Sequence, residues 1–427
     1  MPETQHNFLS RLLFILYLAF CISMIFAFRA ISSITIPFIL LTGLIKNKIE
    51  QKRFLNTNLK NPLIITGCLL FVVQGISLLY ANDVNQGWRN ILLKSLVIVV
   101  PASILCCDYI TQTTRKSILR WYCIALLVAC VFAIYTAMRN YFTLHSYSVF
   151  LYHALVSIYS GHAIQFSILV FVALVYLFEM LIRREIFLKK AFHPFLICFF
   201  IIFLFLLSSK LVIAFFLVYF ISSMIRLYRL SFFNKVLVIS ALGVILISAS
   251  LILLIPNRIN NRFKEIADTN FGFLNQEKYN PGEYFNGLQF RMLQWRFVPQ
   301  ILNEKKAWLT GVSIGDAQSY LNQKYISADM YIGTPARHDK GFIGYNTHDE
   351  FLEALLQTGI PGLLIFLLFI ITLLARAWKV RTPEIIFTTV LLVIYSFTES
   401  VLESQYSLLI FLFFPLFFYA GKKNIQS

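Results

Sequence analysis

The sequence predicts an all-α polytopic membrane protein, with about 12 transmembrane helices and one large loop domain between spans 9 and 10. Hydrophobic residues make up 58% of the 427 residues and charged residues only 13%. A soluble domain could not bury so much apolar surface, so part of the surrounding solvent must be lipid. Apolar runs of about 17–22 residues recur along the chain, the length that crosses a hydrocarbon core of roughly 30 Å.

The first apolar run has no small-residue cleavage site and is followed by Arg29, so we expect it to be a retained span. The second and eighth runs are short, and the eleventh and twelfth nearly abut. The predicted spans are centred on residues 12–28, 30–45, 63–80, 91–108, 118–137, 162–181, 192–208, 211–225, 236–255, 361–378, 385–400 and 404–420.

Lysine and arginine alternate between the gaps that separate these spans. Every second gap is strongly basic, whereas the intervening short gaps hold only Arg29, Arg89, Lys94, Arg139 and Lys210. The positive-inside rule therefore predicts that both termini are cytoplasmic and that the long polar segment faces the periplasm. The net charge of +17 is explained by this topology and does not indicate a nucleic-acid partner. None of the seven cysteines lies in the polar segment, which argues against a disulfide framework or a cysteine metal site.

This pattern divides the chain into three parts. Residues 1–255 form transmembrane helices 1–9, residues 256–350 form a periplasmic helical loop domain, and residues 351–427 form a surface helix followed by helices 10–12. Within the loop domain, Asn286 is a plausible cap for a helix that carries Arg291 beside an apolar face. Pro299 is expected to end or kink that helix.

The turn at Gly311–Asp316 allows two interpretations. Its two glycines could bring backbone N–H groups around a phosphate, or they could simply form a tight turn. A lone pair of glycines is weak evidence for a phosphate site, so the structural interpretation is favoured.

The polar segment closes on the strongest motif of the chain. Thr347 followed by Glu350 fits a capping box, which makes His348 the first residue of a helix at the membrane surface. Gly359 and Pro361 then predict a stop and a new start. A helix N-terminus favours anions and disfavours a charged imidazole, so a neutral His348 could accept a proton. The alternative is that His348 merely packs under the helix start.

Two outward-facing cations could contact phosphate groups. Lys210 occupies a tight turn between two apolar runs, where it would either bind phosphate or extend its side chain to the membrane interface. Arg89 is either a lipid-phosphate contact or an ordinary interface anchor.

Two carboxylates lie at the outer junction of the last two spans. Glu399 and Glu403 share a helical face if that stretch is helical, and could pair with Arg291 or Lys210 or help to orient a sugar. His162 starts the sixth span on the same side, where a structural capping role and a functional role are both open.

Taken in order, these segments resemble the bacterial O-antigen ligase and O-antigen polymerase superfamily of polytopic membrane glycosyltransferases. The resemblance covers residues from about 200 to 405, and the first half of the chain matches in topology only. The matching pieces are Ser208–Lys210, Leu288–Arg291 with Trp295, Gly311–Asp316, Tyr345–Leu352, Gly359–Leu364, and Thr398–Ser400 with Leu402–Glu403.

The resemblance implies a GT-C-like fold and a metal-independent, inverting transfer without a cofactor. The donor would be an undecaprenyl-diphosphate-linked glycan at the periplasmic face of the bacterial inner membrane. His348 would be the catalytic residue, supported by Asn346 and Thr347, and Arg291 would bind the diphosphate. The family usually has arginine where this chain has Lys210, and lysine lacks the planar fork that grips phosphate. The polar segment contains no Asp-x-Asp pair that would hold a metal on a diphosphate.

The resemblance leaves the acceptor open. Ligation of O-antigen to the lipid A core is the primary interpretation, and polymerisation onto a second lipid-linked glycan is the alternative. A polar-lipid transporter or flippase is the alternative from another class, although no internal repeat is evident and the main ionisable groups lie at the outer face.

Overall fold

The computed structural model describes residues 2–51, 60–107, 109–159, 162–229, 271–334 and 339–420. Within these ranges every regular element is a helix. Eight of the described helical segments are long and apolar enough to cross a membrane, and three shorter apolar helices accompany them. The described part of the chain is therefore all-helical, and its apolar helices are those of a multi-pass membrane protein.

Eleven of the twelve predicted spans coincide with described helices, whereas the ninth, at 236–255, lies outside the described residues together with the predicted domain boundary at 255. The helices are α1 (Pro2–Ile25), α2 (Arg29–Gln51), α3 (Pro62–Ser77) with η2 (Leu78–Tyr80), α4 (Val84–Lys94), α5 (Leu96–Leu105), α6 (Gln112–Leu144), α8 (Ala163–Ile182), α9 (Phe192–Leu206), α10 (Lys210–Arg229), α15 (Glu350–Val380), α16 (Pro383–Ser396) and α17 (Gln405–Ala420).

The fourth span begins earlier than the sequence predicts. Asp83 caps α4 by accepting a hydrogen bond from Gln86 N at 2.9 Å, and the apolar segment runs from Val84 to Leu105 with a break at Ser95. Arg89 and Lys94, which were expected in a short outer gap, therefore lie within this helical segment.

Basic residues assigned to the cytoplasmic side by the positive-inside rule gather at one end of the helices. Arg183 follows α8 and pairs with Glu384 at the start of α16. Arg226, near the end of α10, lies 2.6 Å from Glu179 in the last turn of α8. The ends of α8 and α10 thus meet the start of α16, as the alternating directions of the predicted spans require.

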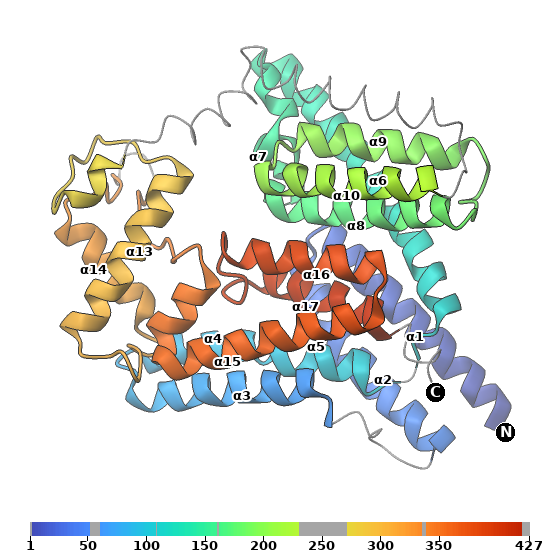
Figure 1. Cartoon of the computed structure of the whole chain (residues 1–427), viewed down its shortest axis with the longest axis horizontal. Helices are drawn as coiled ribbons and strands as arrows, with labels where there is room; N and C mark the ends of the chain where they lie inside the picture. Colours follow the sequence, from blue (N-terminus) through green and yellow to red (C-terminus); the bar gives the residue numbers. More distant parts are fainter. Residues whose placement is uncertain are drawn as a thin grey trace.

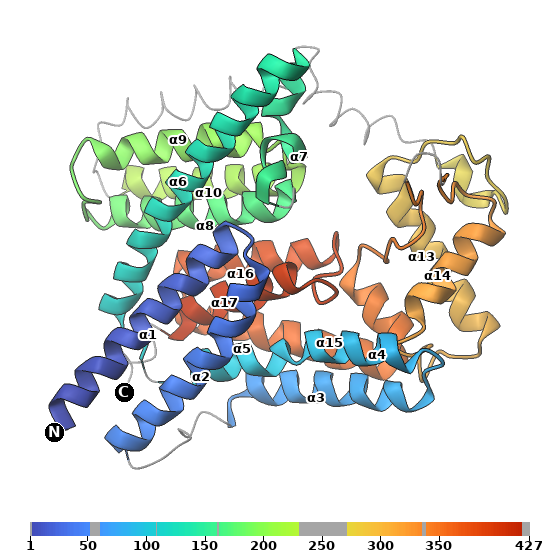
Figure 2. The ribbon, with the colours of Figure 1, turned by 180° about the vertical axis from the view of Figure 1, so that it is seen from behind.

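The loop domain, here the described residues 271–334 and 339–349, has a hydrophobic core separate from that of the transmembrane helices, and Leu355 and Leu356 of α15 also contribute to it. Its main helices are α13 (Gly287–Glu304) and α14 (Ala317–Ser327), which lie beside the ends of α3, α4 and α15 (Figures 1 and 2). Asn286 caps α13 as predicted, because its side chain accepts from Leu288 N and Gln289 N at 3.0 Å. Pro299 does not end α13, which continues to Glu304.

The turn at Gly311–Asp316 joins the loop domain to the transmembrane helices. Its backbone N–H groups donate inside the protein: Val312 to Leu356 O at 2.8 Å, Ser313 to Gln357 O at 3.0 Å, and Ile314 to Ser77 Oγ at 3.2 Å. Since these donors are already used, the turn has no cradle of N–H groups for a phosphate. The structural interpretation of the two glycines fits the observed contacts.

Asp316 ties the same turn to the segment between α3 and α4. Its carboxylate accepts from the backbone N–H groups of Asn82 at 2.8 Å and Asp83 at 2.9 Å. Gly315 packs so tightly here that a Cβ atom would lie 2.4 Å from Asp83 O. The loop domain is therefore seated on α4 and α15 by backbone contacts, and this seating positions the residues that follow α14.

Candidate functional site

The sequence predicts His348 as the first residue of a helix, whereas in the structure His348 lies one residue before the N-cap of α15. Asp349 is the N-cap, and its Oδ1 accepts from Phe351 N at 2.9 Å and Leu352 N at 3.2 Å. The predicted capping box is wrong because both of its side chains are used elsewhere: Thr347 bonds to Glu353, and Glu350 accepts from Leu402 N. His348 has a φ of 47°, the left-handed region that histidine tolerates better than most residues.

Asn346 and Thr347 hold the backbone on the N-terminal side of His348. Asn346 Oδ1 accepts from His348 N at 3.1 Å, and the Asn346 carbonyl accepts from the Gln294 side chain on α13. Thr347 is fully buried and donates to Glu353 Oε2 from its hydroxyl at 2.8 Å and its backbone N–H at 3.2 Å. The loop domain and α15 together therefore fix the turn that carries the imidazole.

Glu399 lies against the imidazole of His348. Its Oε1 is 3.3 Å from His348 Nδ1, within ion-pair distance but not aligned as a hydrogen bond. The Nδ1 edge is buried, while the His348 side chain as a whole keeps 23% of its surface exposed. The ring also lies edge-on to Phe290 and tilted against Tyr345, with centroid distances of 6.2 Å and 5.6 Å. The imidazole is thus oriented by one carboxylate and two aromatic rings.

The segment from 397 to 404 is not helical, so Glu399 and Glu403 do not share a helix face. Glu399 meets His348, whereas Glu403 Oε1 lies 2.6 Å from the fully buried Lys94. Of the roles that the sequence left open for these glutamates, the structure shows these two contacts, and the charge of Arg291 also acts on Glu399. The sequence reasoning missed Lys94, although a lysine inside an apolar run is a recognisable signal.

Arg291 contacts the same segment from α13. Its Nε and Nη2 donate to Thr398 O at 3.1 Å and 2.8 Å, and its Nη1 donates to Gly287 O at 2.8 Å. The remaining N–H groups of this guanidinium are not engaged by described residues. Arg291 therefore anchors the residue that precedes Glu399 and still has donors to offer.

The charges around Glu399 keep it ionised. Burial raises its pKa, but the contact with His348 and the charges of His162 and Arg291 outweigh burial and hold the pKa below its usual value of 4.5. Burial lowers the pKa of Arg291, and Glu399 opposes that shift. Burial likewise lowers the pKa of His162, at the start of α8. Glu399 thus interacts electrostatically with Arg291, His348 and His162.

Two further predicted cations, Lys210 and Arg89, come from other helices. Lys210 is the first residue of α10 and lies two residues after Ser208, whose φ of 49° turns the chain. Arg89 is exposed on α4. The roles of Lys210 and Arg89 at the site stay predictions.

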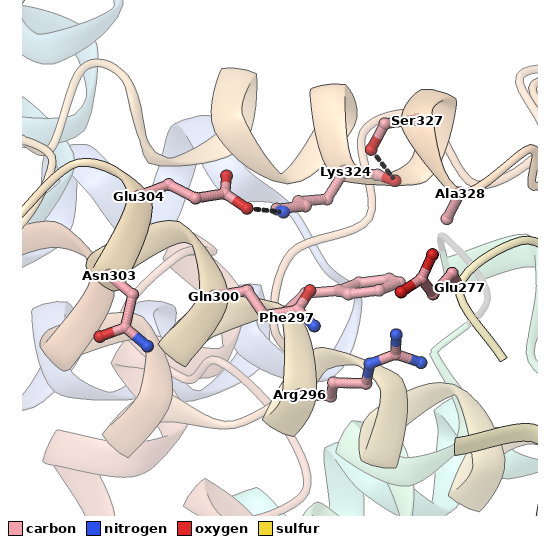
Figure 3. A pocket seen from close by; sticks show the side chains of 9 residues that line it. All are labelled: Glu277, Arg296, Phe297, Gln300, Asn303, Glu304, Lys324, Ser327 and Ala328. Atoms are coloured by element: carbon pink, nitrogen blue, oxygen red, sulfur yellow. Dashed lines mark hydrogen bonds and ion pairs between the residues drawn. The ribbon is translucent and has the colours of Figure 1, made fainter. Parts of the chain in front are cut away.

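A polar cavity of about 370 Å³ opens on another face of the loop domain (Figure 3). Arg296, Gln300, Glu304 and Lys324 contribute to its walls, and Glu304 and Lys324 form an ion pair. Because α-helices have 3.6 residues per turn, Arg291 and Arg296 are separated by about 140° around α13. The cavity is therefore distinct from the group around Glu399. Among the described residues, no cluster of three or more His, Cys, Asp or Glu side chains has the arrangement of a metal site.

A comparison with known families finds one that fits this arrangement. A family model described as O-antigen ligase matches residues 194–367. This match supports the O-antigen ligase superfamily for that segment of the chain. The match runs from α9 into α15 and contains Lys210, Arg291 and His348, while Glu399 lies beyond it. Superfamily members are membrane enzymes of the O-antigen ligase or polymerase type, in agreement with the resemblance drawn from the motifs. A search of curated proteins finds no significant match.

Proposed function

We propose that the chain is a metal-independent, inverting glycosyltransferase that moves an undecaprenyl-diphosphate-linked glycan onto an acceptor sugar hydroxyl. The acceptor we favour is the lipid A core, which makes the reaction O-antigen ligation. The family match supports the reaction class. The observation that carries the assignment is the contact of His348 Nδ1 with Glu399 Oε1 at 3.3 Å, beside the partly exposed guanidinium of Arg291.

His348 acts as the general base. A carboxylate facing Nδ1 favours the tautomer that carries its proton on Nδ1, which leaves the lone pair on Nε2 for the acceptor. The acceptor oxygen attacks the anomeric carbon and its proton passes to Nε2, while the bond from that carbon to the diphosphate oxygen breaks. The leaving diphosphate keeps the electron pair, and the single displacement inverts the anomeric centre. Such base catalysis is typically worth about 10²–10⁴-fold in rate.

Cations stabilise the departing diphosphate. Arg291 offers the N–H groups that Thr398 and Gly287 leave unused, and charge-assisted hydrogen bonds of this kind are the strong ones. Lys210 provides a second, less directional charge from the start of α10. Arg89, exposed on α4, is a supporting contact for lipid phosphate.

The proposed topology follows the charge pattern. Residues 1–255 and 351–427 carry the transmembrane helices, residues 256–350 form the periplasmic domain, and both termini are cytoplasmic. The site then faces the periplasm, on the bacterial inner membrane, where both lipid-bound substrates meet. The contacts of Arg183 and Arg226 with acidic residues at the opposite end of the helices support this orientation.

The test is transfer by the purified protein from a lipid-linked glycan to lipid A-core. His348→Asn is the variant of choice because asparagine tolerates a left-handed φ. Loss of about 10²-fold or more is expected, at unchanged expression. The control is His145→Asn, since His145 is exposed and has a φ of 49°. Transfer by His348→Asn at the wild-type rate would refute the general base.

A deletion strain separates the ligase from its alternatives. A bare lipid A core with accumulated lipid-linked polymer is the outcome expected of a ligase. Single O-units on the core would instead identify a polymerase, which uses a second lipid-linked glycan as acceptor. Lipid movement across vesicles without any transfer by the purified protein would identify a flippase and overturn the enzymatic assignment.

A further inference from the structure

Lys94 is a buried cation that the proposed reaction does not use. Its side chain is completely buried within the apolar segment Val84–Leu105. Its Nζ lies 2.6 Å from Glu403 Oε1 and 2.5 Å from Gln357 Oε1. An ionisable group in this position is costly unless it is paired, and such groups usually serve a function.

The partners of Lys94 continue as an unbroken series of hydrogen bonds toward His348. Gln357 presents its oxygen to Lys94, which fixes the direction of its amide N–H₂ group. That group donates to Glu353 Oε1 at 2.7 Å and to Glu403 Oε1 at 2.9 Å. Glu353 Oε2 in turn accepts from the backbone N–H and the hydroxyl of Thr347. Lys94 is thus linked to the residue that immediately precedes His348.

The series also determines the backbone at His348. The Thr347 hydroxyl, which donates to Glu353, also lies 2.8 Å from Asp349 O and 3.1 Å from Ser400 Oγ, so Thr347 is packed between α15 and the segment that precedes α17. His348, between Thr347 and Asp349, has a φ of 47°. A strained backbone of this kind persists only where its surroundings impose it. Glu353, through its two bonds from Thr347, belongs to these surroundings, and Lys94 contacts Glu403 and Gln357 behind it.

We propose that Lys94 is a positioning residue for His348. The inference rests on the proposed role of His348 as the base, and it extends the site to a residue outside the segment that matches the family, 194–367. Without the ammonium group, Glu353 and Glu403 repel each other and the amide of Gln357 loses the partner that sets its orientation. Thr347 then loses a fixed acceptor, and the imidazole moves away from its alignment with Glu399.

The experiment measures kcat and KM for Lys94→Met in the same transfer assay. A fall in kcat of about 10–100-fold is expected, as for other residues that orient a catalytic side chain, with KM for the donor unchanged. The double variant Lys94→Met with Glu403→Gln removes both charges of the pair and is expected to recover most of kcat. Lys116→Met is the control, because Lys116 pairs with Glu185 at 2.6 Å at the other end of the helices.

Three results would each overturn the inference. They are a wild-type kcat in Lys94→Met, a rise in KM alone in that variant, and no recovery of kcat in the double variant. Should Lys94→Met not accumulate in membranes, Thr347→Val breaks the same series at its other end while keeping the shape of the side chain. Wild-type kcat in that variant also overturns it. His348→Asn, run in parallel, distinguishes the two proposals: if it retains transfer, the base assignment fails, whereas its inactivity beside an active Lys94→Met refutes the positioning role alone.

Discussion

His348 Nδ1 and Glu399 Oε1 lie 3.3 Å apart, although one residue precedes α15 and the other lies between α16 and α17. Neighbouring residues hold both His348 and Glu399 in place. Asn346 and Thr347 fix the turn at His348, and Arg291 holds the carbonyl of Thr398 next to Glu399. A carboxylate that orients an imidazole in this way is a common device for holding one tautomer of a base.

Replacing Glu399 by glutamine should impair catalysis while leaving substrate binding intact. The amide keeps the size of the side chain but loses the charge that favours a proton on Nδ1, so kcat should fall by about 10–100-fold. Steady-state transfer kinetics measure the effect, with Glu304→Gln as the control because Glu304 pairs with Lys324 on another face of the loop domain. An equal kcat in wild type and Glu399→Gln would remove Glu399 from the mechanism.

The same substitution should also change stability in a way that depends on pH. The pKa of Glu399 in the folded protein lies below 4.5, so ionised Glu399 stabilises the fold above that pH, and the contribution is lost as pH falls through the lowered pKa. Glu399→Gln should therefore have a lower Tm than wild type at pH 7. The two Tm values should converge when the pH is brought well below 4.5. Thermal unfolding in detergent at several pH values tests this, and a Tm difference that grows on acidification would contradict it.

The charge of Asp349 should affect stability with the opposite sign to that of Glu399. Burial raises its pKa above the ordinary 3.8, against the opposing effect of its hydrogen bonds to Leu352 N and Phe351 N. Its ionised form therefore destabilises the fold at pH 7, and this cost disappears as pH falls toward 3.8. Asparagine caps helices as well as aspartate does, so Asp349→Asn should match or exceed the wild-type Tm at pH 7, and the gain should shrink on acidification.

Alanine at the same position provides the contrast. Asp349→Ala removes the cap and should cost about 0.5–2 kcal/mol of stability. A lower Tm in Asp349→Asn than in Asp349→Ala would show that the cap is not the main role of this side chain.

Local signals predicted the parts of the site that depend on neighbouring residues. Residue type and spacing predict the cap at Asn286. They also predict the break in α15 at Gly359, which has a φ of 70°. They do not decide whether Thr347 or Asp349 is the cap of α15, because both side chains are good caps. The choice depends on Glu353, which occupies the Thr347 hydroxyl in the folded protein.

Contacts between distant segments could not be read from the sequence. The segment from 397 to 404 has the spacing of a helix face, yet it is not helical, and its two glutamates reach different partners. Lys94 meets Glu403 only because α4 packs near α15 and the α16–α17 junction. The pattern of apolar runs indicates that these helices exist, but not which polar side chains face one another.

Arg291 should not be replaceable by lysine. Two of its nitrogens converge on Thr398 O, a geometry that a single ammonium group cannot reproduce. Arg291→Lys should lower kcat/KM by about 10–100-fold, in line with the roughly 1.5–3 kcal/mol attributed to hydrogen bonds of charged groups. Arg296→Lys is the matched control on α13, since Arg296 bonds to the carbonyls of Leu274 and Gln276 outside the site. Equal losses in the two variants would indicate a general effect on the loop domain.

Gly311 should tolerate no side chain, because it seats the loop domain on α15. Its φ is +69°, and a Cβ atom would lie 2.4 Å from the backbone of Gln357 and Thr358. Gly311→Ala should therefore cost at least about 1–3 kcal/mol in backbone strain alone, before the clash is counted, and should reduce both Tm and the amount of folded protein in membranes. Gly75→Ala is the control: Gly75 lies in α3, and a Cβ atom there would have no neighbour within 4 Å, so alanine should leave Tm unchanged or raise it. Because Gln357 also contacts Lys94 and Glu353, the folded fraction of Gly311→Ala should lose kcat as well. A Gly311→Ala protein with the Tm and kcat of wild type would show that this backbone contact does not position the site.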